Sequence, residues 1–214
     1  CLATSDCLSD FLMVVDANLC VNKANYYVKE NVDHEVAIDT DGTVRENVTL
    51  TYNNTGPGET WPGGTYKNYL RLFLPLGTQL GNIQINGSDV SFSSGISSLD
   101  RKVPDGTLEV DREDGSFGKT IFGFLITVAP KTQKTVSVSY NLNKPMVNTK
   151  KSQYRLLVQK QLGSQENNYN LKINFPLSWV AKANPLPNQS QPGELLFSFP
   201  LSRDTIFKLD FNKK

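Results

Sequence analysis

Apolar and polar residues alternate along most of this chain from about residue 23 onward. Within residues 48–53, 135–140 and 169–175, hydrophobic side chains occupy every second position, and Asn, Thr, Ser or Lys occupy the positions between them. A period of two is typical of a β-strand with one face in the core and the other in water. Each of these segments is therefore predicted to be a half-buried strand.

Three further segments are apolar on both faces. Residues 121–129 are apolar at nearly every position, and residues 69–74 are similar. Such segments are typical of central strands that are covered on both sides. Near the start of the chain, the apolar run at residues 11–15 favours a strand over a short helix.

Turn residues separate these segments. Asp41-Gly42 and Asn86-Gly87 each lie between two predicted strands, and both pairs are typical of tight hairpin turns. The sequence therefore predicts an all-β fold, an antiparallel β-sandwich with a short N-terminal extension, formed either as one sandwich or as two packed lobes. A polar, basic and proline-containing stretch at residues 142–152 is the candidate internal boundary.

Four segments carry a resemblance to a known family, namely residues 10–19, 22–29, 50–54 and 61–77. They resemble the C-terminal region of bacterial surface proteins of the domain of unknown function 4012 family, over residues 8 to about 80. The resemblance implies a single-pass, outward-facing protein, with residues 1–30 as the tail of a preceding region and residues 31–214 as the β-module. It supplies no catalytic residues. Cys20 departs from the pattern, where a small residue such as glycine is expected.

The charge balance excludes some function classes. The chain has 22 basic and 21 acidic residues and a formal net charge of +1. A general nucleic-acid binder carries a strong basic excess, so no nucleic-acid partner is expected. No apolar run approaches the roughly 18 residues that a spanning helix needs. Membrane attachment is therefore expected only through an anchor outside this chain.

All three cysteines lie near the start of the chain, at Cys1, Cys7 and Cys20. At most one disulfide can form among them, and it would indicate an oxidising compartment. The sequence leaves the pairing open. It also leaves open three unpaired thiols, or a lipidated Cys1.

Catalytic signatures are scarce. A Ser-His-Asp or Cys-His site needs a histidine as base, and His34 is the only one in the chain. Because it lies between Asp33 and Glu35, we expect a solvated surface histidine. The sequence singles out no pair of carboxylates for sugar hydrolysis, and the chain is predicted not to be an enzyme.

The glycine- and proline-rich segment 56–69 is the candidate ligand site. Trp61, Tyr66 and Tyr69 would offer apolar platforms to a sugar ring, and Asn68 would bind its hydroxyl groups. The alternative is a loop folded over the end of the sandwich, with Trp61 covering the core.

Calcium is the one candidate cofactor, and no other is expected. Asp39 and Asp41 could supply oxygen ligands, although Asp41-Gly42 is also common hairpin chemistry and the twelve-residue spacing of an EF-hand is missing.

These observations predict an extracellular, cell-surface β-module with a structural or adhesion role, in contact with a surface protein or a cell-wall glycan. A carbohydrate-binding module that uses the 56–69 loop is one alternative. An accessory domain of a cell-envelope enzyme is the other.

Overall fold

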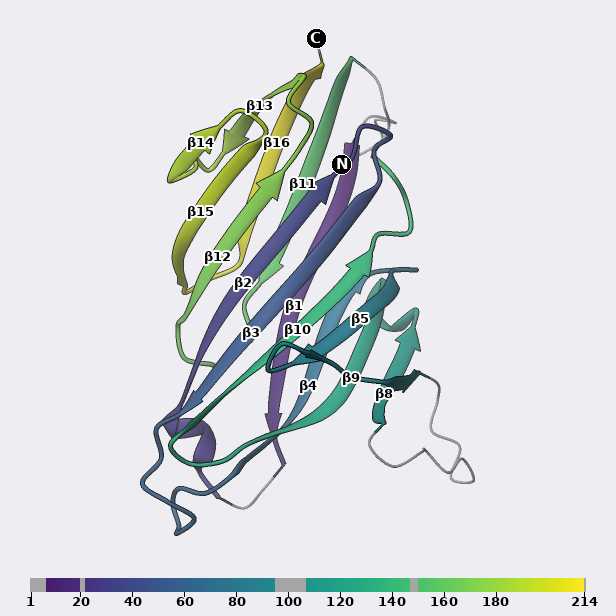
Figure 1. Cartoon of the computed structure of the whole chain (residues 1–214). Helices are drawn as coiled ribbons and strands as arrows, with labels where there is room; N and C mark the ends of the chain where they lie inside the picture. The colour runs from purple at the N-terminus through teal and green to yellow at the C-terminus, as the bar shows by residue number, and fades with distance from the viewer. Residues whose placement is uncertain (1–6, 20–21, 95–106, 147–149, 214) are drawn as a thin grey trace.

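The computed structural model describes residues 7–19, 22–94, 107–146 and 150–213. They form an all-β sandwich of two mixed eight-stranded sheets (Figure 1). The predicted fold class is therefore confirmed. Among the described residues, no helix is long and apolar enough to cross a membrane. Two short 3-10 turns, η1 (Ala24–Tyr27) and η2 (Ser116–Gly118), interrupt the strands.

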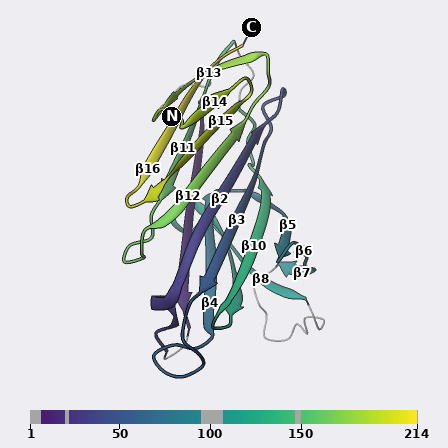
Figure 2. The ribbon, with the colours of Figure 1, turned by 60° about the vertical axis from the view of Figure 1, so that its left-hand side comes forward.

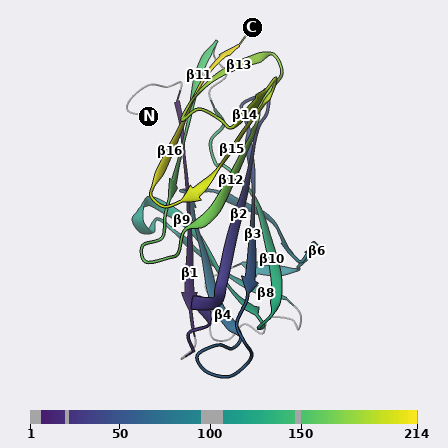
Figure 3. The same cartoon turned by 90° about the vertical axis from the view of Figure 1, so that its left-hand side faces the viewer.

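The first sheet has the spatial order β13 (Trp179–Asn184), β16 (Thr205–Lys213), β11 (Lys151–Gln159), β1 (Cys7–Asn18), β4 (Tyr66–Pro75), β9 (Lys119–Val128), β8 (Leu108–Asp114) and β7 (Phe92–Ser94). The second has the order β14 (Gln189–Gln191), β15 (Glu194–Leu201), β12 (Asn167–Asn174), β2 (Val28–Ile38), β3 (Val44–Asn54), β10 (Thr132–Asn141), β5 (Gln79–Ile85) and β6 (Ser88–Asp89). Figure 2 shows β12, β2, β3 and β10 side by side in the second sheet. Figure 3 shows the sandwich turned further, with β16 and β1 towards one side and β12, β2 and β3 beside them.

Each sheet is assembled from both ends of the sequence. Strands β1 to β10 form one half of each sheet, and β11 to β16 form the other half. The halves meet at two parallel pairs, β1 with β11 and β2 with β12. Purely antiparallel pairing was expected, and these long-range pairs make the sheets mixed. The stretch 142–152 is where the chain passes from one half to the other.

β1 is an interior strand of the first sheet, between β11 and β4. Residues 7–18, which the resemblance assigned to a preceding region, therefore pack as part of the sandwich. Leu12 on this strand is 1% exposed.

The core lies between the sheets, because alternation points one side of each strand inward. On β3, Val48, Leu50 and Tyr52 are all fully buried. Phe122 and Phe124 of β9, in the other sheet, are fully buried too. Each such side chain stabilises the fold by about 1.5–3 kcal/mol.

Candidate binding groove on the second sheet

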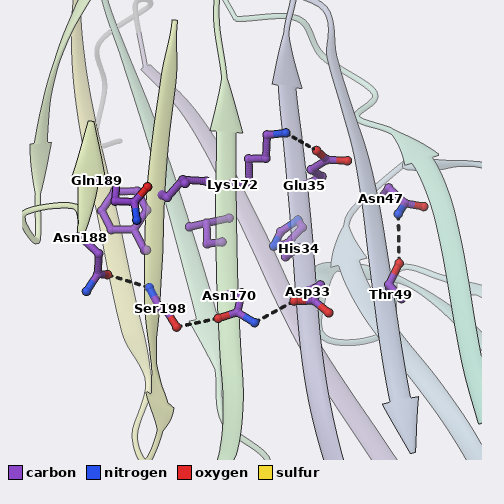
Figure 4. Close-up of a pocket in the computed structure, with 13 residues that line it drawn as sticks. Asp33, His34, Glu35, Asn47, Thr49, Asn170, Lys172, Asn188, Gln189 and Ser198 are labelled. Atoms are coloured by element: carbon purple, nitrogen blue, oxygen red, sulfur yellow. Dashed lines mark hydrogen bonds and ion pairs between the residues drawn. The ribbon is translucent and has the colours of Figure 1, made fainter. Parts of the chain in front are cut away.

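A groove of about 410 Å³ lies on the outer face of the second sheet, over β2, β3, β12, β14 and β15 (Figure 4). Most of its lining residues have amide, hydroxyl or charged side chains, although the accessible surface of the lining is mainly apolar; the polar residues are Asp33, Glu35, Asn47, Thr49, Asn170, Lys172, Asn188, Gln189 and Ser198. Leu196 adds an apolar patch.

Strand alternation and register place these side chains in rows. On β2, Val32 and Val36 are buried, so Asp33 and Glu35 point outward. Parallel pairing of β2 with β12 sets Asn170 beside Asp33 and Lys172 beside Glu35. Each row thus crosses strands that are far apart in the sequence.

One row is a chain of hydrogen bonds. The Asn170 amide donates to Asp33 Oδ1 at 2.7 Å, and the Ser198 hydroxyl donates to Asn170 Oδ1 at 2.6 Å. The Ser198 backbone N–H donates to Asn188 Oδ1 at 2.7 Å. Figure 4 shows this chain running across the groove. The amides are therefore held in fixed orientations.

A second row is charged. Lys172 Nζ lies 3.0 Å from Glu35 Oε1 and 3.5 Å from Glu194 Oε2. The hydrogen bond to Glu35 raises the pKa of Lys172 above its usual value. The groove thus offers a positively charged donor beside carboxylate acceptors.

His34 lies beneath this groove, in the core. It is 2% exposed, because it shares the inward face of β2 with Val32 and Val36. Its Nδ1 lies 2.6 Å from the Tyr169 hydroxyl, and its Nε2 lies 2.7 Å from Glu46 Oε2. The expectation of a solvated surface histidine was wrong.

His34 belongs to a buried polar cluster that spans both sheets. Tyr140 donates to Glu46 Oε2 at 2.9 Å on the second sheet, and Tyr154 donates to Asp10 on the first sheet. Burial raises the pKa of Glu46 to about 7 and lowers the pKa of His34 to about 4. Burial, followed by the nearby Glu46, raises the pKa of Asp10 well above its usual range.

A signal for this cluster was present in the alternation. Glu46 falls on the same strand face as the buried Val44 and Val48. A charged residue at an inward position needs a buried partner, and that requirement pointed to His34 or to another polar residue of the core.

The four residues of the predicted loop site do not share one surface. Trp61 is 74% exposed, so it does not cover the core. β4 begins at Tyr66, and its alternation takes Tyr66 and Asn68 into the interior, at 3% and 0% exposed. Tyr69 points to the opposite face and donates to Asp111.

The two predicted calcium ligands are engaged in local contacts. Asp39 Oδ2 lies 2.7 Å from Arg45 Nη2, and Asp41 Oδ1 accepts the Thr43 backbone N–H at 2.9 Å. That bond lowers the pKa of Asp41. In the part of the chain that the structure describes, no group of three or more His, Cys, Asp or Glu residues could hold a metal.

Of the three cysteines, Cys7 lies half-buried at the start of β1. Cys1 and Cys20 lie outside the described residues. The disulfide therefore stays a prediction.

Neither a family model nor a curated protein matches this chain. An M1 zinc metallopeptidase from Deinococcus radiodurans is similar in structure over 86% of this chain and 42% of its own, with 11% identity and a TM-score of 0.41. Native leukotriene A4 hydrolase from Saccharomyces cerevisiae is similar over 89% of this chain and 30% of its own, with 10% identity and a TM-score of 0.49. The chain spans less than half the length of each, and likeness at this level does not indicate what it binds.

Proposed function

We propose that this chain is a non-catalytic binding module that holds a hydroxyl-rich ligand, such as a glycan, in the groove on the second sheet. The observation that carries the proposal is the ordered row Asp33–Asn170–Ser198. Carboxamides and carboxylates can each bind adjacent hydroxyl groups, and prior ordering reduces the entropy lost on binding. Leu196 offers an apolar contact for the C–H face of a sugar.

A non-catalytic role is supported by the position of His34. Both of its ring nitrogens are engaged in the core, beneath the groove, rather than beside a ligand. Display outside the cell, as the sequence predicts, would bring the groove to cell-wall glycans.

Binding of the chain to purified cell-wall polysaccharides tests this proposal. We expect Asn170→Ala to weaken binding about tenfold, which corresponds to about 1.4 kcal/mol. Asn212→Ala is the matched control, because Asn212 is exposed on β16 of the other sheet. Trp61→Ala should bind as the wild type does. Loss of binding in Trp61→Ala alone would move the site to the 56–69 loop and contradict the proposal.

A second candidate function is packing against another protein. Apolar side chains form cross-strand rows on the outer face of the first sheet, because Phe11 pairs with Leu157 and Met13 pairs with Phe73. Ile206, next to Leu157, is 39% exposed. Rows of this kind favour a structural or accessory module, since apolar surface gathers at protein contacts.

An apolar dye such as ANS tests whether that face is accessible. We expect the folded chain to bind the dye and Phe73→Thr to bind less of it, with Leu19→Ala as the control. A folded wild type that binds no dye would count against this second function.

A further inference from the structure

At one end of the sandwich β1 ends and η1 leads into β2 (Figure 1). Residues of these elements line a second cavity. It has a volume of about 380 Å³ and is walled by β1, η1, β2 and the 161–167 segment. Its lining shares no residue with the groove on the second sheet. It is therefore a separate candidate site.

Two acidic side chains, Asp16 and Glu30, line this cavity. Asp16 Oδ1 accepts hydrogen bonds from Tyr52, at 2.9 Å, and from Asn68. Glu30 Oε2 accepts one from Asn167. Within the described residues neither carboxylate forms an ion pair. A buried carboxylate without a countercharge is costly, so the cavity favours a cation.

Two residues that line the cavity each carry a buried acceptor that lacks a donor. Among the described residues, Glu30 Oε1 and Asn18 Oδ1 have no hydrogen-bond partner. The Asn18 amide nitrogen donates to the backbone oxygen of Asn22 at 3.1 Å and to Asn25 Oδ1 at 3.3 Å. The Tyr52 hydroxyl donates to Asp16 Oδ1 at 2.9 Å, and its hydrogen bonding to the Glu30 carboxyl opposes the rise in the pKa of Glu30. Buried polar atoms are almost always satisfied, so these acceptors call for donors from a ligand.

We propose that this cavity binds the primary ammonium group of a small organic amine. An ammonium group has three donors and no acceptor, which matches the unpartnered oxygens of Glu30 and Asn18. Its charge complements Asp16 and Glu30. Tyr26, which also lines the cavity and is 73% exposed, offers aromatic surface for the cation and its methylene chain.

The walls are fixed before a ligand arrives. The Gln161 side chain accepts from the Asp16 backbone N–H and donates to the Asp16 backbone oxygen, both at 2.9 Å. Lys160 Nζ donates to the backbone oxygens of Gln161 and Ser164, at 3.1 and 2.8 Å. The loop is therefore bound to β1, and ligand binding would not have to order it.

Burial raises the pKa of Asp16 to about 6, and burial together with the charge of Asp16 raises the pKa of Glu30 well above its usual range. An ammonium ligand would favour the charged carboxylates. We therefore expect amine binding near pH 6 to release protons.

Calorimetric titration of the whole chain with putrescine is the test. The diol of the same chain length and tetramethylammonium, a cation without N–H groups, are the ligand controls. We expect putrescine to bind and both controls to bind at least tenfold more weakly. The heat near pH 6 should change with the ionisation enthalpy of the buffer, which reports proton release.

Glu30→Gln removes the charge and leaves an amide of similar size, so it should weaken putrescine binding at least tenfold. Asp16→Asn is the second cavity variant, and Glu35→Gln in the groove is the matched control. Circular dichroism checks that each variant is folded. Equal binding of the diol, full binding by folded Glu30→Gln, or no binding of putrescine by the folded wild type would each overturn the proposal.

Discussion

At the scale of single residues, the unusual feature is the number of ionisable groups in the core. His34 and Glu46 face each other at 2.7 Å with side chains that are not exposed at all. Asp10 from the other sheet belongs to the same cluster. The proton count of these groups differs between the folded and unfolded states, so the stability of the fold depends on pH.

Glu46 and His34 act with opposite signs. Glu46 has a folded pKa of about 7 against 4.5, so the folded state holds more protons and the free energy of unfolding falls as pH rises through this window. His34 has a folded pKa of about 4 against 6.5, so its contribution rises with pH over that range. Between pH 6 and 8, Glu46 alone should lower the free energy of unfolding by about 1 kcal/mol.

Glu46→Gln removes the contribution of Glu46 to the free energy of unfolding, which falls as pH rises. Between pH 6 and pH 8, the free energy of unfolding of the variant should therefore change by about 1 kcal/mol less in the negative direction than that of the wild type. Urea unfolding at the two pH values measures it. Glu166→Gln, on an exposed loop, is the control. An unchanged pH dependence in Glu46→Gln would show that Glu46 does not titrate in this range.

At the scale of secondary-structure elements, β1 has the most informative position. It pairs with β11 through residues 7–13 and with β4 through residues 13–18. A strand in that place contributes to the core as well as to the backbone ladder. The resemblance implied instead that this segment is the tail of a preceding region.

Leu12→Ala tests the contribution of β1. Leu12 is 1% exposed, so the substitution should lower the free energy of unfolding by about 2–4 kcal/mol through lost burial and the cavity that remains. Leu19→Ala, just beyond the strand and 58% exposed, should change it by less than about 0.5 kcal/mol. Similar small effects in both variants would mean that β1 is not part of the stable core.

At the scale of the whole molecule, the two halves of the chain share both sheets. The parallel pairs β1–β11 and β2–β12 continue each sheet from one half into the other. Each half alone would expose the unpaired edges of two long strands. The halves should therefore unfold together, although the chain boundary at 142–152 separates them in sequence.

Unfolding in urea, followed by two probes, tests this cooperativity. In a Trp61→Phe background Trp179 is the remaining tryptophan, and it is 6% exposed in the C-terminal half. Its fluorescence then reports on that half, whereas far-ultraviolet circular dichroism reports on all strands. We expect coincident transitions. Val48→Ala on β3, in the N-terminal half, should shift both midpoints equally. An unshifted fluorescence midpoint would show that the halves unfold independently.

The sequence by itself determined which segments are strands, where the hairpins turn and which face of most strands is buried. These properties are local, since alternation and turn residues act within a few positions. Only the tertiary structure decided which strands pair. Asn170 and Asp33 are 137 residues apart, yet they form the centre of the groove. Local patterns cannot specify this, because a strand with a given alternation pairs equally well with many others. The neighbouring strands of the sheet fix the register of each strand and the residue at which it begins. This is why His34 is buried and why Tyr66 and Asn68 do not belong to the predicted loop site.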